Sequence, residues 1–247
     1  MIKDAVKKLA EAFGYRIQRI PGNRFQAMRD TLKMLSARGY APSMVIDGGA
    51  NMGQWTSLAG PIFPDAVFHL IEPQPACEAA LAAVTRDRPR MIVHRLAITA
   101  PGVSSVVILG GAHEVGSSGA YVALPEESGA DAMQCPAATL DALFAHVAPE
   151  HGVMLKLDLE GHELEALRGA VELLKKVEVV LSEVRFYDIN HGGRPVFRQL
   201  LMFLSDHGFE LYDIAALTAR PKDKRLALGD VVFVRRDSAL RADSSFE

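Results

Sequence analysis

A short glycine-rich stretch of the chain has the composition of a ligand-binding turn. Residues 44–46 are apolar and predict a buried strand, which ends at the acidic Asp47. The glycines that follow, Gly48, Gly49 and Gly53, suit a turn in which the backbone adopts positive φ or approaches a ligand closely. Because nucleotide-like ligands bind at the carboxyl ends of strands in α/β sheets, this stretch is the first candidate binding site.

The spacing of these residues separates two classes of cofactor. A dinucleotide site needs the pattern Gly-x-Gly-x-x-Gly, but from Gly49 onward Asn51 and Gln54 stand where the other glycines would be. The sequence therefore disfavours an NAD-dependent dehydrogenase. The pattern that is present, Asp47-x-Gly49-x-x-x-Gly53, resembles that of methyltransferases dependent on S-adenosylmethionine (SAM). SAM carries an amino-acid moiety that a carboxylate and backbone groups at such a turn can hold.

A second acidic residue, Glu72, ends a strand predicted at 67–71, about twenty residues beyond the glycine turn. A carboxylate at this place can accept hydrogen bonds from both hydroxyls of a ribose. Pro73 forces extended backbone at Glu72 and helps the side chain to project from the strand end. Glutamate is usually a surface residue, but its combination with Asp47 and the glycine turn favours ligand binding.

Ionisable residues also crowd the end of a later strand, predicted at 153–157 and interrupted only by Lys156. Four ionisable residues follow within a few positions: Asp158, Glu160, His162 and Glu163. Carboxylates crowded at a strand end raise one another's pKa, so one of them can act as a base. Glu163 equally suits the N-terminus of a helix through the helix dipole, and its role stays open.

The predicted elements around these motifs alternate between strand and helix. Strands are predicted at residues 44–46, 67–71, 91–93, 153–157, 177–181, 209–212 and 230–234. Helices are predicted at residues 75–86, 139–147, 164–174 and 196–207, with Leu164, Leu167, Val171 and Leu174 on one face of the third. This alternation predicts a doubly wound α/β sheet with right-handed crossovers.

Two amphipathic stripes, at 2–13 and 25–35, precede the first strand, and Gly39 is the expected C-cap of the second. Residues 102–138 break the later alternation and predict a β-hairpin insertion. We therefore predict an N-terminal helical cap (1–42), a main domain with this insertion (43–236) and a flexible polar tail (237–247).

The composition restricts the class of protein. A chain of 247 residues with 49% apolar residues can build one large domain with a full core. The net charge of −3 gives no general attraction to nucleic acid or to an anionic membrane. Cys77 and Cys135 form neither a disulfide framework nor a metal-binding pattern. Without a transmembrane stretch or a signal-peptide core, the sequence predicts a soluble cytoplasmic protein.

Several motifs occur in a characteristic order: residues 45–53, Glu72-Pro73, Leu96-Ala97, residues 139–141, residues 156–163, residues 167–170 and residues 182–184. As a set they resemble the FkbM-type SAM-dependent methyltransferase family, over roughly residues 43–185. Two positions depart from the pattern, Gly48, where valine is common, and His162, where a small or aromatic residue is usual.

The resemblance implies the class I methyltransferase fold, a seven-stranded, mostly parallel sheet with an antiparallel last strand. Family members mostly methylate hydroxyl oxygens of sugars, polyketides and related natural products. The implied SAM-binding residues are Asp47, Gly48, Gly49, Ala50, Asn51, Gly53, Glu72, Pro73 and Ala97. The N-terminal cap and the loop after Glu183 lie outside the resemblance, and these parts usually form the acceptor pocket.

A hydroxyl oxygen is a weak nucleophile, so a base or a metal ion should assist its methylation. The candidate bases are Asp158, Glu160 and His162, with His191 in the following polar loop as an alternative. Asp158 and Glu183, at neighbouring strand ends, could instead hold Mg²⁺ beside the acceptor oxygen. The sequence leaves both mechanisms open.

Two other functions share parts of this pattern. A non-catalytic SAM-binding protein would keep Asp47 and Glu72 but would need no carboxylate cluster at Asp158 and Glu160. A nucleic-acid methyltransferase shares the fold, but the net charge and the lack of a basic-aromatic patch disfavour it. The expected partner is a small-molecule or glycan hydroxyl acceptor, and a homo-oligomer remains open.

Overall fold

The computed structural model describes residues 24–110, 119–144, 146, 152–189, 192–243 and 245. Two features of the sequence analysis, the amphipathic stripe at 2–13 and the candidate base His191, lie outside these residues. Within the described part of the chain, no helix has the length and hydrophobicity needed to span a bilayer.

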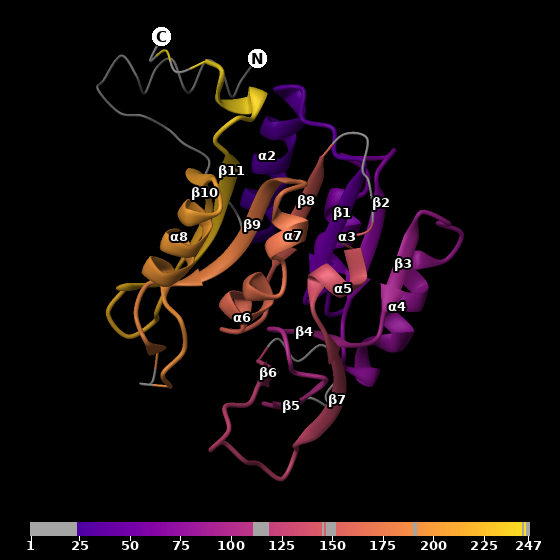
Figure 1. Cartoon of the computed structure of the whole chain (residues 1–247), viewed down its shortest axis with the longest axis vertical. Coiled ribbons are helices and arrows are strands. Elements are labelled where there is room, and N and C mark those ends of the chain that lie inside the picture. Colours follow the sequence, from indigo (N-terminus) through magenta and orange to yellow (C-terminus); the bar gives the residue numbers. More distant parts are fainter. Residues whose placement is uncertain are drawn as a thin grey trace, which may run out of the picture.

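A seven-stranded sheet forms the centre of the described structure (Figure 1). Its strands are β1 (Met44–Gly48), β2 (Val67–Ile71), β3 (Met91–His94), β8 (Val153–Leu157), β9 (Val177–Arg185), β10 (Phe209–Ala219) and β11 (Leu226–Arg235). They lie in the order β10-β11-β9-β8-β1-β2-β3. β11 runs in the opposite direction to the other six strands. The predicted doubly wound sheet with an antiparallel last strand is confirmed.

The strand order reverses between β1 and β8, where ligands bind in open α/β sheets. Gly48 at the end of β1 pairs with Ile71 of β2 on one side and with Leu157 of β8 on the other. The residues after these strands therefore emerge together at one edge of the sheet. This register brings together the glycine turn, Glu72 and Asp158.

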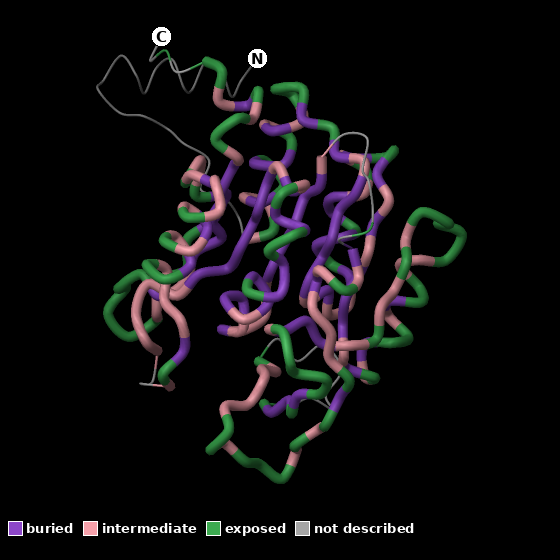
Figure 2. The backbone as a smooth tube through the Cα atoms, viewed as in Figure 1, coloured by how far each residue is buried: buried purple, intermediate pink, exposed green. Residues whose placement is uncertain are grey.

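Helices cover both faces of the sheet and bury its apolar strands, which Figure 2 shows as a continuous buried centre. One face carries α2 (Arg24–Ala37), α3 (Gln54–Ala59) and α4 (Glu78–Thr85), the last preceded by the 3₁₀ turn η1 (Pro75–Cys77). The other face carries α5 (Leu140–Phe144), α6 (Glu163–Arg168), α7 (Val171–Leu174) and α8 (Phe197–Asp206). As predicted, Met28, Leu32 and Leu35 of α2 are buried, and Gly39 follows that helix with φ of +90°, but Phe25 of the same predicted stripe is exposed.

The helix predicted at 164–174 is two helices, α6 and α7, separated at Gly169. A Cβ at Gly169 would lie 2.2 Å from the carbonyl oxygen of Thr99, so the chain passes this point without room for a side chain. The carboxylate of Asp141 accepts hydrogen bonds from the backbone N–H groups of Glu172 and Leu173 and thereby caps α7. Because α7 starts anew after the break, Val171 is exposed rather than part of the predicted apolar face.

A second, smaller sheet lies beyond the carboxyl ends of the main strands (Figure 1). In the described residues it consists of β4 (Ala97–Ile98), β5 (Ser105–Leu109), β6 (Tyr121–Val122) and β7 (Met133–Ala138). β5 and β6 pair antiparallel, as a hairpin does, and β7 adds an antiparallel strand that the sequence analysis does not predict. Since β4 also pairs with β7, the insertion is joined to the segment that carries Ala97.

The segment after Asp237, expected to be flexible, contains the 3₁₀ turn η3 (Ala239–Arg241). The hydroxyl of Ser238 donates a hydrogen bond of 2.6 Å to Glu178 and accepts one from the backbone N–H of Leu240. Leu240 is buried and belongs to the core on the α2 side of the sheet. These contacts attach residues 238–240 to the domain.

We expect Leu240→Ala to lower the free energy of unfolding by about 2 kcal/mol, because it removes a buried side chain from the core. Leu226→Ala is the matched control, since Leu226 is exposed, and we expect it to cost less than about 0.5 kcal/mol. Urea unfolding of both variants measures this difference. Equal, small losses would show that the end of the chain adds nothing to the core.

Candidate active site

A buried ion pair holds the glycine turn in place. The Nζ of Lys156 lies 2.9 Å from Oδ1 of Asp47 and donates a hydrogen bond of 2.9 Å to the carbonyl oxygen of Gly49. The other carboxylate oxygen of Asp47 accepts a 2.7 Å hydrogen bond from the hydroxyl of Thr56 at the start of α3. Burial lowers the pKa of Lys156, but Asp47 and Asp158 raise it by more, so the ammonium group stays charged.

The backbone of this turn requires glycine at Gly49. Its φ is +76°, and a Cβ there would lie 2.0 Å from the carbonyl oxygen of Asp158. Gly53, with φ of +75°, begins α3, and Asn51 also has a positive φ of 48°. The turn therefore brings its backbone against the end of β8, as the sequence predicts for a site of close approach.

Glu72 connects the glycine turn to the end of β2. Its carboxylate accepts hydrogen bonds from the backbone N–H of Asn51 at 2.8 Å and from that of Gln74 at 3.0 Å. Burial raises the pKa of Glu72, while these two hydrogen bonds act in the opposite direction. A carboxylate accepts up to about four hydrogen bonds, so Glu72 keeps capacity for the hydroxyls of a ligand.

A cavity of about 170 Å³ opens beside these residues at the edge of the sheet. Of the residues predicted to form the site, its wall contains Gly49, Ala50, Asn51, Glu72, Pro73, Ala97, Asp158, Glu160 and His162. Asp47, Gly48 and Gly53 lie behind the wall and shape the turn. Asp47, which the sequence analysis assigns to ligand binding, is fully buried and contacts Lys156 instead.

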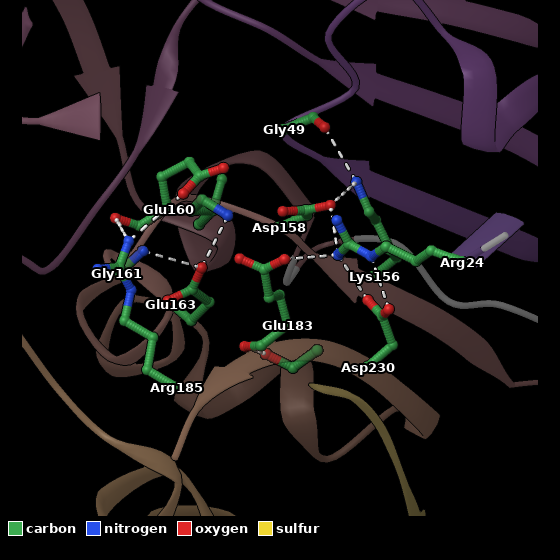
Figure 3. Close-up of polar contacts among 12 residues, drawn as sticks. Arg24, Gly49, Lys156, Asp158, Glu160, Gly161, Glu163, Glu183, Arg185 and Asp230 are labelled. Carbon is green, nitrogen blue, oxygen red and sulfur yellow. Dashed lines mark hydrogen bonds and ion pairs between the residues drawn. The ribbon is translucent and has the colours of Figure 1, made fainter. Parts of the chain in front are cut away.

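Three carboxylates converge on Arg24, the first residue of α2 (Figure 3). Its Nη2 lies 3.0 Å from Asp158, 2.7 Å from Glu183 and 2.6 Å from Asp230, and its Nε donates a 2.6 Å hydrogen bond to Asp230. The sequence analysis misses Arg24 and Asp230 as site residues. Neither carries a local signal, because Arg24 lies in the predicted cap, 134 positions before Asp158.

Glu160 is a partly buried carboxylate with a perturbed pKa. Burial, together with the negative charge of Asp158, raises its pKa to about 7, although Arg185 acts against the shift. The Nη2 of Arg185 donates a 2.9 Å hydrogen bond to the carbonyl oxygen of Glu160 and lies 3.4 Å from its carboxylate. The backbone of Glu160 has φ of +53°, and the hydrogen bond from Arg185 to its carbonyl oxygen supports this conformation.

The other two ionisable residues of the predicted cluster are engaged in the structure. Glu163 is buried and accepts hydrogen bonds from the N–H groups of Leu159 and Gly161, so it closes the loop before α6. The Nε2 of His162 lies 3.0 Å from the hydroxyl of Thr99. Burial and the charge of Arg194 lower the pKa of His162 to about 4, so the ring is neutral at neutral pH.

Arg194, which precedes α8, joins the insertion to the loop after β9. Its guanidinium donates hydrogen bonds to the carbonyl oxygen of Val122 at 3.0 Å and to Glu127 at 2.8 Å. The same group lies over the ring of Tyr121, with 4.5 Å to the ring centroid. Because Tyr121 and Val122 line the cavity, this contact fixes one of its walls.

We expect Lys156→Met to lower the free energy of unfolding by about 3–5 kcal/mol, because it leaves Asp47 charged and buried without its partner. The double variant Asp47→Asn/Lys156→Met should be more stable than Lys156→Met alone, since it buries no uncompensated charge. Lys175→Met, at an exposed lysine, is the control. Denaturant unfolding gives the three values, and a double variant less stable than the single one would contradict the assignment.

Residues 47–211 match the family described as the methyltransferase FkbM domain. No curated protein matches the chain in sequence.

Solved structures with similar folds are distant in sequence. The N-methyltransferase NodS from Bradyrhizobium japonicum in complex with S-adenosyl-L-homocysteine is 11% identical with a TM-score of 0.49, over 87% of this chain and 90% of that one. A putative RNA methyltransferase from Pyrococcus horikoshii is 15% identical with a TM-score of 0.45, over 88% of this chain and 85% of that one.

Proposed function

The chain belongs to the FkbM methyltransferase family, and we propose that it transfers the methyl group of SAM to a hydroxyl oxygen of a sugar, polyketide or related natural product. One observation carries the choice of a hydroxyl acceptor. Glu160, a carboxylate with its pKa raised to about 7, lines the same cavity as the glycine turn and Glu72. A base of this strength suits the removal of a proton from a hydroxyl group at neutral pH.

The residues of the cavity fit SAM as the cofactor. Glu72 is held by two backbone N–H groups and the side chain of Gln74, and a carboxylate can still accept a hydrogen bond from a ribose hydroxyl. Trp55 and Gln74 also line the cavity, and among the described residues neither Nε1 of Trp55 nor Oε1 of Gln74 has a hydrogen-bond partner. Buried polar atoms without partners indicate a ligand that supplies them.

Apolar side chains complete the wall and suit the flat, apolar faces of an adenine ring: Ile71, Leu96, Ile98 and Ile108. When bound, SAM supplies an electrophilic methyl group on a sulfonium centre. The protein's main task is then alignment, since well-oriented reactants gain about 7–11 kcal/mol over free ones.

Among the candidate bases, Glu160 is the best suited to accept the proton of the acceptor hydroxyl. Asp158 is already paired with two cations, Arg24 at 3.0 Å and Lys156 at 3.9 Å, which hold its carboxylate in place. His162, with its pKa lowered to about 4 and its Nε2 beside Thr99, is a weak base. We therefore assign the base to Glu160 and a positioning role to Asp158.

We expect SAM or S-adenosylhomocysteine to stabilise the protein, whereas NAD should not. A ligand at about one hundred times its dissociation constant adds about 2.7 kcal/mol of stability. For a domain of this size, that raises the melting temperature by about 5–10 °C. Glu72→Gln should remove most of this shift, because an amide offers a single acceptor oxygen in place of two.

Glu78→Gln is the control for this thermal-shift measurement, since Glu78 is half exposed and pairs with Arg95 at the surface. If wild type shows no shift with either SAM or its product, the assignment of this cavity to SAM is wrong.

We expect the rate of methyl transfer to rise with pH through an apparent pKa of about 7, because Glu160 acts only after it has lost its proton. Glu160→Gln should remove this dependence and lower kcat by roughly 10²–10⁴-fold. Glu165→Gln, on the partly exposed surface of α6, should leave both the rate and the profile unchanged.

An acceptor screen with isotopically labelled SAM, followed by mass spectrometry of the product, provides the substrate for these kinetics. Attachment of the methyl group to nitrogen or carbon, or a Glu160→Gln variant with the wild-type pH profile, would overturn the proposal.

A further inference from the structure

Four carboxylates gather beside the cavity, at the carboxyl-end edge of the sheet. Asp158 and Glu160 follow β8, and Glu183 and Asp230 lie on β9 and β11. Carboxylate oxygens of Asp158, Glu160 and Glu183 lie within 4.8 Å of one another, a spacing that a divalent cation can bridge. In Figure 3, Asp158, Glu183 and Asp230 point towards the guanidinium of Arg24, and Glu160 lies on the side of Arg185.

A guanidinium nitrogen lies among three of these four carboxylates, all except Glu160. Nη2 of Arg24 contacts an oxygen of Asp158, Glu183 and Asp230 at once, at 3.0, 2.7 and 2.6 Å. Carboxylates from three separate strands thus share one cationic atom. This is the arrangement of ligands around a metal ion, with nitrogen in the place of the metal.

We propose that Arg24 replaces a divalent metal ion in this carboxylate cluster and holds Asp158 and Glu183 in position for the reaction. The proposal rests on the proposed function only in taking these carboxylates as the acceptor side of the site. It makes Arg24 a positioning residue that acts through its partners. The chemistry at the acceptor oxygen then needs no metal ion.

Charge balance supports this role. Carboxylates this close repel one another unless a cation lies between them, and the repulsion is strong because Glu183 and Asp230 are buried. Two further cations lie near the cluster, but Lys156 is paired with Asp47 and lies 3.9 Å from Asp158, and Arg185 pairs with Glu160. Removal of Arg24 would therefore leave a concentrated negative charge that attracts cations from solution.

The attachment of Arg24 explains why it can hold this place against a free ion. Its Nε and Nη2 contact the two oxygens of Asp230 at 2.6 Å each, which is the bidentate geometry that arginine favours. Its helix, α2, is fixed to the sheet through Met28, Leu32 and Leu35. The positive charge of Arg24 is therefore part of the folded chain and, unlike a bound ion, does not exchange with solvent.

Titration with Mn²⁺, followed by electron paramagnetic resonance of the free ion, tests the proposal on the full chain without SAM or acceptor. Wild type should leave Mn²⁺ free. Arg24→Met, which keeps the length of the side chain but removes its charge, should bind one Mn²⁺ with a dissociation constant of roughly 10⁻⁴ M, at least about tenfold tighter than wild type. Arg24→Lys, which keeps a positive charge, should not gain the site.

Arg29→Met is the matched control, because Arg29 is exposed on the same helix and the substitution removes the same charge. Arg24→Gln provides a second neutral variant if Arg24→Met does not fold. Tight Mn²⁺ binding by wild type would overturn the proposal, as would folded neutral variants that bind no more Mn²⁺ than wild type.

This titration is independent of methyl transfer. If SAM binding or activity fails while the variants gain Mn²⁺, the proposed function is wrong and the role of Arg24 stands. The opposite pattern would reject Arg24 as the substitute for a metal and leave the methyltransferase assignment intact.

Discussion

The buried pair of Lys156 and Asp47 is the interaction on which the site depends. The two residues lie opposite each other in the register of β8 and β1, at the point where the strand order reverses. A buried ammonium group must be paired, and this one contacts Asp47 and the carbonyl oxygen of Gly49. The pair thereby fixes the position of the glycine turn relative to the two strands. Within that turn, the backbone N–H of Asn51 donates a hydrogen bond to Glu72 and positions it.

Burial raises the pKa of carboxylates in the site, and nearby cations lower it. Burial and the charge of Asp158 raise the pKa of both Glu183 and Glu160, that of Glu160 to about 7, while Arg24 beside Glu183 and Arg185 beside Glu160 act against these shifts. Asp158 lies between Arg24 and Lys156. Carboxylates with shifted pKa values gathered in one place are typical of sites of proton transfer in enzymes.

The sequence predicts the parts of this site that depend on local pattern. The strand ends, the glycine turn, Glu72 and Asp158 follow from short apolar runs that stop at acidic or glycine residues. Lys156 is visible as a charge inside a buried strand, although its partner is not. Arg24 could not be predicted, since its contacts with Asp158 and Asp230 depend on how α2 lies on the sheet. The division of the helix at Gly169 also depends on tertiary packing, because the nearby carbonyl of Thr99 excludes a side chain there.

Arg194 gives the cavity a property that none of its separate segments has. Its buried guanidinium, in the loop after β9, donates hydrogen bonds to Val122 and Glu127 of the insertion, and a Cβ at Gly161 would lie 2.8 Å from its Cδ. The loop after β9 therefore acts on the cavity through the insertion, which lines it. A change in the length of either loop must be matched by a change in the other to keep this junction.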